Sequence, residues 1–387
     1  MSSIDFKEAI QQFGTPTYIF DIDILPQRVK AIKSIADQKV ALCYAIKANP
    51  FLTKEMSDLT DRIEVCSPGE LEICIAENID PSKILISGVN KTSDLIERAL
   101  YYGVRFFTAE SVKHMNLLHA VAFEKKTSIK VFLRLTSGSQ FGMDKSALIT
   151  IISERAEYKY CEILGIHYFV GTQRGKLSQH AKELGKIKQL MLSLKEEYGY
   201  ETKELEYGPG LYYPYFQNEE ESGLGLFHEF MDVFNTVGIE CRTTIEMGRY
   251  FAAECGYYLT AVNDTKVNKK HRIAIVDGGV HHLNYYGGGM GMFIPKFVIL
   301  KAEKLPREKN EWMICGSLCS TADVIISSVE IEDLKEDDVF VFKNVGAYSM
   351  TEGLSLFLSR DLPKVIIYKN GSFEEKRGRI STFQFNH

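Results

Sequence analysis

The sequence predicts an α/β protein in which a (β/α)8 TIM-type barrel is followed by a C-terminal all-β domain. Through most of the chain, short apolar runs alternate with amphipathic helical stretches, which is typical of βα units. From about Tyr257, β-branched and aromatic runs separated by Gly, Asn and Asp replace this alternation. We therefore expect the barrel over 25–255 and the β domain over 256–387 together with 1–24.

Eight apolar runs are the predicted barrel strands, at 40–46, 62–66, 83–87, 104–110, 129–135, 163–170, 204–208 and 243–249. The predicted helices lie between them, at 51–60, 67–77, 92–102, 110–125, 145–158, 177–199 and 220–237. Ser67 and Glu70 have the spacing of a capping box, with Pro68 at the first helical position. An open doubly wound sheet is the alternative, but no G-x-G-x-x-G follows the first strand.

The second domain is predicted from runs at 257–262, 272–276, 297–300, 338–342 and 365–368. Few helical stretches separate them, so an all-β architecture follows. The run 18–20, which precedes the barrel, is expected to join this domain as a strand.

The composition is that of a globular protein, with 45% hydrophobic and 25% charged residues and a net charge of −5. This balance argues against nucleic acid or an anionic membrane as the main partner. We find no secretory signal and no run of the roughly 18 apolar residues that cross a bilayer. The eight cysteines form no C-x-x-C pair. We expect a cytoplasmic protein with reduced cysteines and no metal site.

Lys47 directly follows the first predicted strand, after an apolar run from Val40 to Ile46. Burying an ammonium is costly, and a buried lysine that gives up its proton becomes a nucleophile able to form a Schiff base. The alternative is an ordinary lysine that reaches solvent from a strand end.

Other chemically active residues also fall at the C-terminal strand ends, which share one mouth in a barrel. They are Glu64, Arg134, His167, Phe169, Gly208, Gly210, Glu246, Gly248 and Arg249. Glycine-bearing turns after the last three strands would let backbone N–H groups approach an oxyanion. Turns required by chain geometry alone are the alternative.

A nucleophilic lysine beside a phosphate site points to pyridoxal 5′-phosphate. Glu246 would hold the proton of the pyridine nitrogen, and Phe169 or His167 would stack on the ring. A salt bridge from Glu246 to Arg249 is the alternative. In the second domain, Cys319 with Asp323 and Tyr348 in a glycine turn are candidate catalytic residues, with packing roles as their alternative.

Taken together, these motifs resemble the fold-type III pyridoxal-phosphate decarboxylases, the group of diaminopimelate, ornithine and arginine decarboxylases. The resemblance covers nearly the whole chain and rests on seven separated segments in the same order. They are 44–49, 64–70, 165–173, 208–210, 246–249, 319–323 and 346–348.

The resemblance implies a role for each matching residue. Lys47 would be the Schiff-base lysine, Thr172 would contact the phosphate, and Glu246 and Arg249 would serve the pyridine nitrogen and the phosphate. Cys319 and Tyr348 would come from the second subunit of a homodimer. The predicted substrate contacts are Asp323, His282 and Tyr285.

Departures from the family pattern bear on the substrate. Phe169 stands where a histidine usually stacks on the pyridine ring, and Pro209 interrupts the usual glycine triplet. Ser320 and Tyr285 stand where diaminopimelate decarboxylases carry a glutamate and a substrate-binding arginine. Losing both charges should weaken binding of diaminopimelate, whose distal charges would be buried unpaired.

The run Asp277-Gly-Gly-Val-His-His282 and the aromatic Phe169 resemble a subgroup of antibiotic and siderophore biosynthesis decarboxylases, which includes the enzyme of butirosin biosynthesis that acts on a carrier-bound glutamyl group. We therefore expect a decarboxylase of a modified, conjugated or carrier-tethered amino acid. The alternatives are a decarboxylase of a free diamino acid such as diaminopimelate, ornithine or lysine, a racemase, and a non-catalytic cofactor-binding protein.

Overall fold

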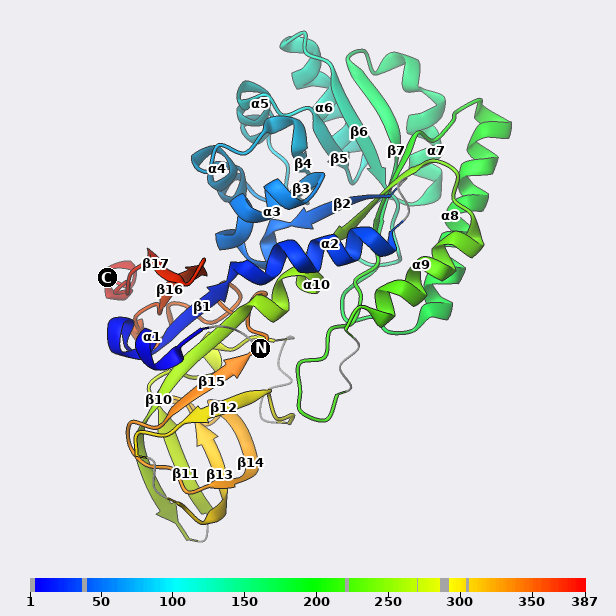
Figure 1. Cartoon of the computed structure of the whole chain (residues 1–387). Helices are drawn as coiled ribbons and strands as arrows, with labels where there is room; N and C mark the ends of the chain where they lie inside the picture. The colour runs from blue at the N-terminus through cyan, green and yellow to red at the C-terminus, as the bar shows by residue number, and fades with distance from the viewer. Residues whose placement is uncertain (1–3, 37–39, 220–222, 270, 286–291, 304–305) are drawn as a thin grey trace. The chain divides into compact units, whose positions relative to one another are not determined.

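The computed structural model describes residues 4–36, 40–219, 223–269, 271–285, 292–303 and 306–387 (Figure 1). The chain forms two compact units. We call Gln27–Tyr213 with Ser222–Phe251 the barrel unit. We call Met1–Pro26, Pro214–Glu221 and Ala252–His387 the sheet unit.

A closed barrel of parallel strands forms the centre of the barrel unit, as predicted. Its strands are β2 (Val40–Ala45), β3 (Arg62–Val65), β4 (Ile84–Ile86), β5 (Phe106–Ala109), β6 (Ile129–Arg134), β7 (Cys161–Phe169), β8 (Glu204–Gly208) and β9 (Arg242–Met247). Pairing of β9 with β2 closes the barrel and sets Cys43 opposite Glu246. The C-terminal ends of all eight strands therefore meet at one mouth.

Among the described residues of the barrel unit, one helix precedes the first barrel strand and one follows each of the eight strands along the chain. They are α2 (Leu25–Ile35), which begins in the sheet unit, α3 (Thr53–Leu59), α4 (Pro68–Ala76), α5 (Ser93–Tyr102), α6 (Val112–Glu124), α7 (Lys145–Ser153), α8 (Leu177–Tyr198), α9 (Gly225–Val237) and α10 (Arg249–Ala252). The predicted cap of α4 is confirmed, because the Ser67 hydroxyl accepts the Glu70 N–H at 3.1 Å. The Glu70 carboxylate in turn accepts the N–H of Cys66 at 2.6 Å.

An ionic cluster fills part of the barrel interior. Nη1 of Arg62 lies 2.7 Å from a Glu204 oxygen and 2.6 Å from a Glu206 oxygen. The Arg62 guanidinium also lies 4.6 Å from the ring centroid of Phe106. Burial raises the pKa of the Glu206 carboxyl to about 8, and Glu246 and Glu204 add to this effect while Arg62 opposes it.

The sheet unit is built on strands in the order β14-β13-β11-β10-β1-β16-β17, with β15 paired to β10 and β12. Its elements are α1 (Phe6–Phe13), β1 (Thr17–Asp21), β10 (Gly256–Asn268), β11 (His271–Val276), β12 (Phe297–Leu300), β13 (Lys309–Cys315), β14 (Val324–Glu332), β15 (Val339–Lys343), β16 (Lys364–Lys369) and β17 (Ser372–Arg377). The predicted strand 18–20 joins this sheet, antiparallel to β10 and parallel to β16.

Several predicted boundaries differ from those observed. The strand predicted at 243–249 ends at Met247, because Gly248 packs against Ala45 and Ala48 and Arg249 begins α10. The helix predicted at 145–158 ends at Ser153 and continues as a short 3₁₀ turn.

Pro214–Glu221, which the predicted boundaries assign to the barrel, belongs to the sheet unit. The Gln217 N–H donates to the Ile294 carbonyl at 2.9 Å, and the ring of Tyr215 lies 5.1 Å from that of Tyr285. These contacts, made by residues distant in sequence, explain the assignment.

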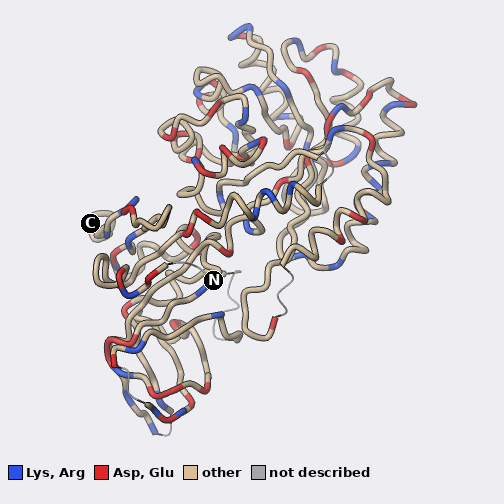
Figure 2. The backbone as a smooth tube through the Cα atoms, in the orientation of Figure 1, with Lys and Arg blue, Asp and Glu red and all other residues tan. Residues whose placement is uncertain are grey.

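Charged residues are interspersed along both units, in keeping with the small net charge (Figure 2). Within the described residues, no helix is long and apolar enough to span a membrane.

Candidate active site

Lys47 lies at the barrel mouth, in a 3₁₀ turn (Ile46–Ala48) that directly follows β2. Its Nζ is 2.8 Å from Oε2 of Glu64 and 3.7 Å from Oε1 of Glu246. It also lies 5.8 Å from the ring centroid of Phe169. The side chain is 35% exposed, so the amine is partly open to solvent while held between two nearly buried carboxylates.

Glu64, on β3, is the acidic partner nearest to Lys47. Burial by itself raises the pKa of the Glu64 carboxyl, but the Lys47 ammonium and hydrogen bonds from Cys66, Lys47 and Ser87 lower it to about 2. The carboxyl is therefore ionised at neutral pH and favours a positive charge on Lys47.

Glu246, near the end of β9, is 5% exposed. Its Oε2 lies 3.3 Å from Nε2 of His167, but no hydrogen bond of good geometry reaches that oxygen within the described residues. Both ring nitrogens of His167 are likewise buried without a hydrogen-bond partner among those residues. A buried carboxylate oxygen that lacks a hydrogen-bond partner is suited to accept a hydrogen bond from a bound molecule.

Three glycines allow close backbone approach beside these residues. A Cβ on Gly248 would lie 2.7 Å from the Cβ of Ala48, and one on Gly208 would lie 2.5 Å from the Phe169 ring. Gly210 has φ +57°, and a Cβ there would lie 1.7 Å from the Gly171 carbonyl. The turns after β7 and β8 are therefore pressed together at positions where only glycine fits.

Thr172 and Arg249 meet beside these turns, because Nε of Arg249 donates to the Thr172 hydroxyl at 3.2 Å. Arg249 is buried, with 7% of its surface exposed. A guanidinium, a hydroxyl and glycine-bearing turns form a donor set suited to a phosphate group.

Arg134, at the end of β6, lies in an environment different from that of the residues around Lys47. It forms an ion pair with Glu110, whose other carboxylate oxygen accepts the Gly142 N–H at 3.3 Å. The Phe141 ring centroid lies 4.9 Å from the Arg134 guanidinium. These contacts tie down the loop between β6 and α7, and a cofactor contact by Arg134 stays a prediction.

The residues at this mouth fit pyridoxal 5′-phosphate, which needs an amine, an acidic partner for the pyridine nitrogen and a phosphate site. One protein family, described as pyridoxal-dependent decarboxylase, pyridoxal binding domain, matches residues 23–253. The chain belongs to this family. It is a pyridoxal-phosphate-dependent decarboxylase, as predicted, and this assignment disfavours the racemase and the non-catalytic alternatives.

Relatives of this decarboxylase cover nearly its whole length. The L-glutamyl-[BtrI acyl-carrier protein] decarboxylase of Niallia circulans is 27% identical, over 94% of this chain and 91% of that protein. A diaminopimelate decarboxylase of Aquifex aeolicus is 26% identical, over 98% of this chain and 92% of that protein. A Helicobacter pylori diaminopimelate decarboxylase crystallised with L-lysine has a TM-score of 0.87, with 98% of each chain covered. Its 21% identity supports the fold alone.

The remaining predicted site residues of the decarboxylase lie in the sheet unit. Cys319 is exposed, in the turn between β13 and β14. Asp323, at the other end of this turn, accepts the N–H groups of Val280 at 2.8 Å and Leu318 at 2.7 Å. Through these bonds Asp323 stabilises the turn. Its contact with the substrate stays a prediction.

Tyr348 is half-buried and has φ +69°, in the left-handed region that tyrosine rarely adopts. Its carbonyl accepts the N–H groups of Thr351 at 2.8 Å and Glu352 at 2.9 Å. The turn thus holds the Tyr348 backbone in a strained conformation, which is common at functional sites.

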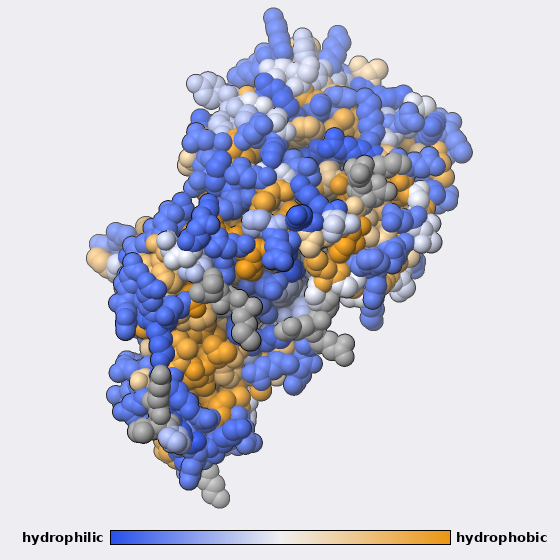
Figure 3. Space-filling model, in the orientation of Figure 1, coloured by the Kyte–Doolittle hydropathy of each residue, from blue (hydrophilic) through white to orange (hydrophobic). Residues whose placement is uncertain are grey.

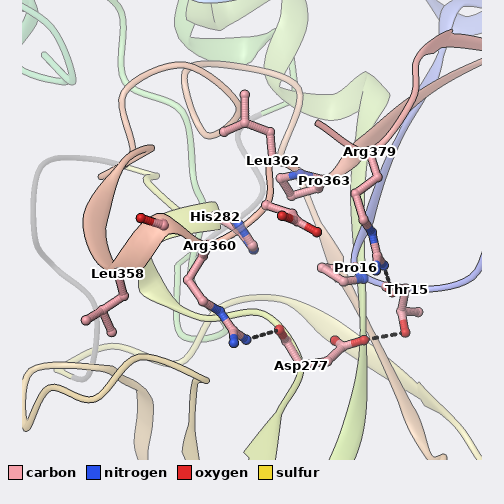
Figure 4. Close-up of a pocket in the computed structure, with 11 residues that line it drawn as sticks. Thr15, Pro16, Asp277, His282, Leu358, Arg360, Leu362, Pro363 and Arg379 are labelled. Carbon is pink, nitrogen blue, oxygen red and sulfur yellow. Dashed lines mark hydrogen bonds between the residues drawn. The ribbon is translucent and has the colours of Figure 1, made fainter. Parts of the chain in front are cut away.

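His282 lines a cavity of about 420 Å³ in the sheet unit (Figure 4). Its Nδ1 lies 2.7 Å from the Tyr258 hydroxyl, and burial, with His281 and Arg360 nearby, holds the pKa of His282 well below its usual range. Around the same cavity, Arg360 and Arg379 donate to the backbone carbonyls of Asp277 at 3.4 Å and Thr15 at 2.8 Å.

Tyr285 is 1% exposed, and its hydroxyl donates to the Lys343 carbonyl at 3.0 Å. The ring packs among aromatic residues of the sheet unit. The position predicted to correspond to an arginine of diaminopimelate decarboxylases therefore holds a buried neutral side chain whose hydroxyl is already bonded.

Sequence reasoning missed Ser87, Cys66 and Glu110, which contact the predicted site residues directly. Each lies at or just beyond the C-terminal end of a barrel strand. The rule that selected Lys47 and Glu64 would therefore have found them, had it been applied to every strand.

Proposed function

We propose that this decarboxylase acts on a modified, conjugated or carrier-tethered amino acid in a biosynthetic pathway. The observation that carries the proposal is the buried, hydrogen-bonded Tyr285. A side chain in this state offers no charge to the distal carboxylate of free diaminopimelate, so burying that carboxylate would be unfavourable.

Pyridoxal phosphate, when bound, supplies an aldehyde that condenses with amines and a ring that withdraws electrons from Cα. Lys47 would hold the cofactor covalently and yield its place to the substrate amine. Glu246 would keep a proton on the pyridine nitrogen, with Oε2 as its acceptor. Arg249, Thr172 and the glycine turns would bind the phosphate, and Phe169 would face the ring.

The chain's second copy would complete the site in a homodimer. As the bond from Cα to the carboxyl breaks and CO2 leaves, Cα must regain a proton. We assign this proton transfer to Cys319 of the partner subunit, or to a group beside it, and cofactor contact to the partner subunit's Tyr348.

A free diamino acid is the second candidate substrate. Diaminopimelate decarboxylases from several bacteria and an archaeon are 23–27% identical to this chain over most of its length, which favours it. A panel assay of CO2 release separates the two candidates, with free diaminopimelate, ornithine and lysine set against carrier-bound glutamate and citrate-conjugated amino acids. Turnover of free diaminopimelate above that of every tethered substrate would contradict the proposal.

The covalent role of Lys47 has its own test. The purified protein reconstituted with pyridoxal phosphate should absorb at about 420 nm, the region of a protonated lysine–cofactor linkage. Lys47→Ala should lack this band, whereas the Lys54→Ala variant, altered on the exposed face of α3, should keep it. A band that survives in Lys47→Ala would overturn the assignment.

A further inference from the structure

A pair of hydrogen-bond donors holds one oxygen of the Glu64 carboxylate. The Cys66 thiol donates to Oε1 at 3.0 Å, and the Ser87 hydroxyl donates to the same oxygen. The other oxygen, Oε2, faces Nζ of Lys47 at 2.8 Å. Oε1 accepts two hydrogen bonds, and these fix the carboxylate in the orientation in which Oε2 pairs with Lys47.

We propose that Cys66 and Ser87 are positioning residues, which orient Glu64 so that its other oxygen, Oε2, stabilises positive charge on the Lys47 nitrogen. The proposal rests on the covalent role proposed for Lys47. It adds two residues that hold Glu64 in this orientation.

The local structure brings the two donors together. Ser87 follows β4, and its N–H donates to the Val65 carbonyl of β3 at 2.9 Å, which continues the pairing of the two strands. The next residue, Gly88, lies so close to β3 that a Cβ would be 1.9 Å from the Cys66 carbonyl. On the other side, Glu70 of α4 fixes the Cys66 N–H at 2.6 Å.

The Cys66 thiol can donate to Glu64 because it stays protonated. Burial, followed by the charge of Glu64, holds the pKa of Cys66 well above its usual range. The thiol therefore remains protonated at neutral pH and donates to the carboxylate. Nζ of Lys47 also donates to the Cys66 sulfur at 3.8 Å, so Cys66 contacts the amine directly as well as holding Glu64.

The other titratable groups around Glu64 and Lys47 bear on any pH-dependent readout. Glu246 lies 3.7 Å from Nζ, and Glu70, Lys91 and Cys43 interact with Glu64 through longer-range electrostatics. The test therefore compares variants that leave all of these groups in place.

The pH at which the reconstituted protein loses its band at about 420 nm reports the charge on the Lys47 nitrogen. A carboxylate held beside this nitrogen raises that midpoint. Cys66→Ala and Ser87→Ala should each lower it by about half a pH unit or more, since one unit is a tenfold change in the ionisation constant. Cys66→Ser, which retains a donor, should return it toward the wild-type value.

Control variants separate orientation from general damage. Cys74→Ala removes another buried thiol, on α4, and should leave the midpoint unchanged. In a Glu64→Gln background, which should itself lower the midpoint, Ser87→Ala should have no additional effect. Thermal unfolding of the cofactor-free variants checks their fold. Should Cys66→Ala not fold, Ser87→Ala tests the same oxygen.

An unchanged midpoint in both alanine variants, or an equal shift with and without Glu64, would overturn the inference. Survival of the band in Lys47→Ala would instead contradict the proposed role of Lys47, so the two failures are distinguishable.

Discussion

Individual residues inside the barrel are held in unusual protonation states by their neighbours. Glu206 is fully buried and accepts a hydrogen bond from Arg62 at 2.6 Å on one oxygen, while its other oxygen has no partner within the described residues. Burial raises the pKa of this carboxyl to about 8. Glu206 is therefore protonated over much of the physiological range, in contrast to Glu64 at the mouth.

Glu206 should make the folded state less stable as the pH rises. Its folded pKa lies above the ordinary value of 4.5, so its stabilising effect is complete below about pH 4.5 and is lost as the pH rises to about 8. From pH 5.5 to pH 8, the free energy of unfolding of the wild type should fall by an amount on the order of 2–4 kcal/mol because Glu206 ionises. Glu206→Gln, which cannot ionise, should not show this fall. Denaturant unfolding at both pH values measures the difference.

Glu196→Gln on the exposed face of α8 is the matched control, and its unfolding should follow the wild type at both pH values. Parallel stability curves for the wild type and Glu206→Gln would contradict the prediction.

Among the structural elements, the turns after the barrel strands determine whether an anion can be bound. The turns after β7 and β8 meet at Gly171 and Gly210, and the Arg174 N–H donates to the Gly210 carbonyl at 2.9 Å. Pro209 removes one N–H from the predicted phosphate site, but the close approach of the turns at Gly210 is retained. The strands set the position of these turns, and glycine permits their contact.

Gly210→Ala should weaken pyridoxal phosphate binding by about tenfold or more, because alanine resists a positive φ and its Cβ would displace Gly171. Titration of the cofactor-free protein with pyridoxal phosphate measures the dissociation constant.

Gly185→Ala provides the control, since Gly185 lies within α8 with nothing within 4 Å of an added Cβ. It should leave cofactor affinity unchanged and stabilise the fold by about 0.5–1 kcal/mol. Equal affinities for both variants would show that the Gly210 turn does not form the phosphate site.

At the scale of the whole molecule, the proposed homodimer requires an exposed surface on which a second copy can pack. Figure 3 shows apolar side chains on the visible face of the sheet unit. Within residues 354–385 of the sheet unit, six large apolar side chains are exposed by 44–64%, at Leu354, Leu356, Phe357, Leu358, Phe383 and Phe385. Such side chains mark an interaction surface where they form one contiguous patch.

Shared sites in a homodimer predict that two inactive variants complement each other. Lys47→Ala and Cys319→Ala should each be nearly inactive on the substrate found in the panel assay. When the two variants are co-expressed in equal amounts and pair at random, half the dimers contain one chain of each kind. Each such dimer has one intact site out of two, so about a quarter of the wild-type activity should return.

Sedimentation of the wild type at several concentrations would check that a dimer forms. Activity no greater than the sum of the separate variants would contradict the shared-site arrangement.

The barrel was predictable because its signal is local. Apolar runs of strand length, separated by amphipathic helices, specify βα units without knowledge of distant contacts. Placing Lys47, Glu64 and Glu246 at one mouth followed from the rule that parallel strands share their C-terminal edge. β13, β14 and β17 were missed, because their many polar residues make them poor candidates by apolar content.

By itself, the sequence determined the fold class, the lysine at the end of the first barrel strand and the family to which the chain belongs. Only the tertiary structure decided how each polar group is paired: the occupied oxygen of Glu64, the Arg62–Glu206 contact and the buried hydroxyl of Tyr285. The physical reason is that strand and helix patterns depend on neighbours along the chain. Hydrogen bonds and pKa shifts instead depend on side chains that meet only after the barrel closes and the sheet forms.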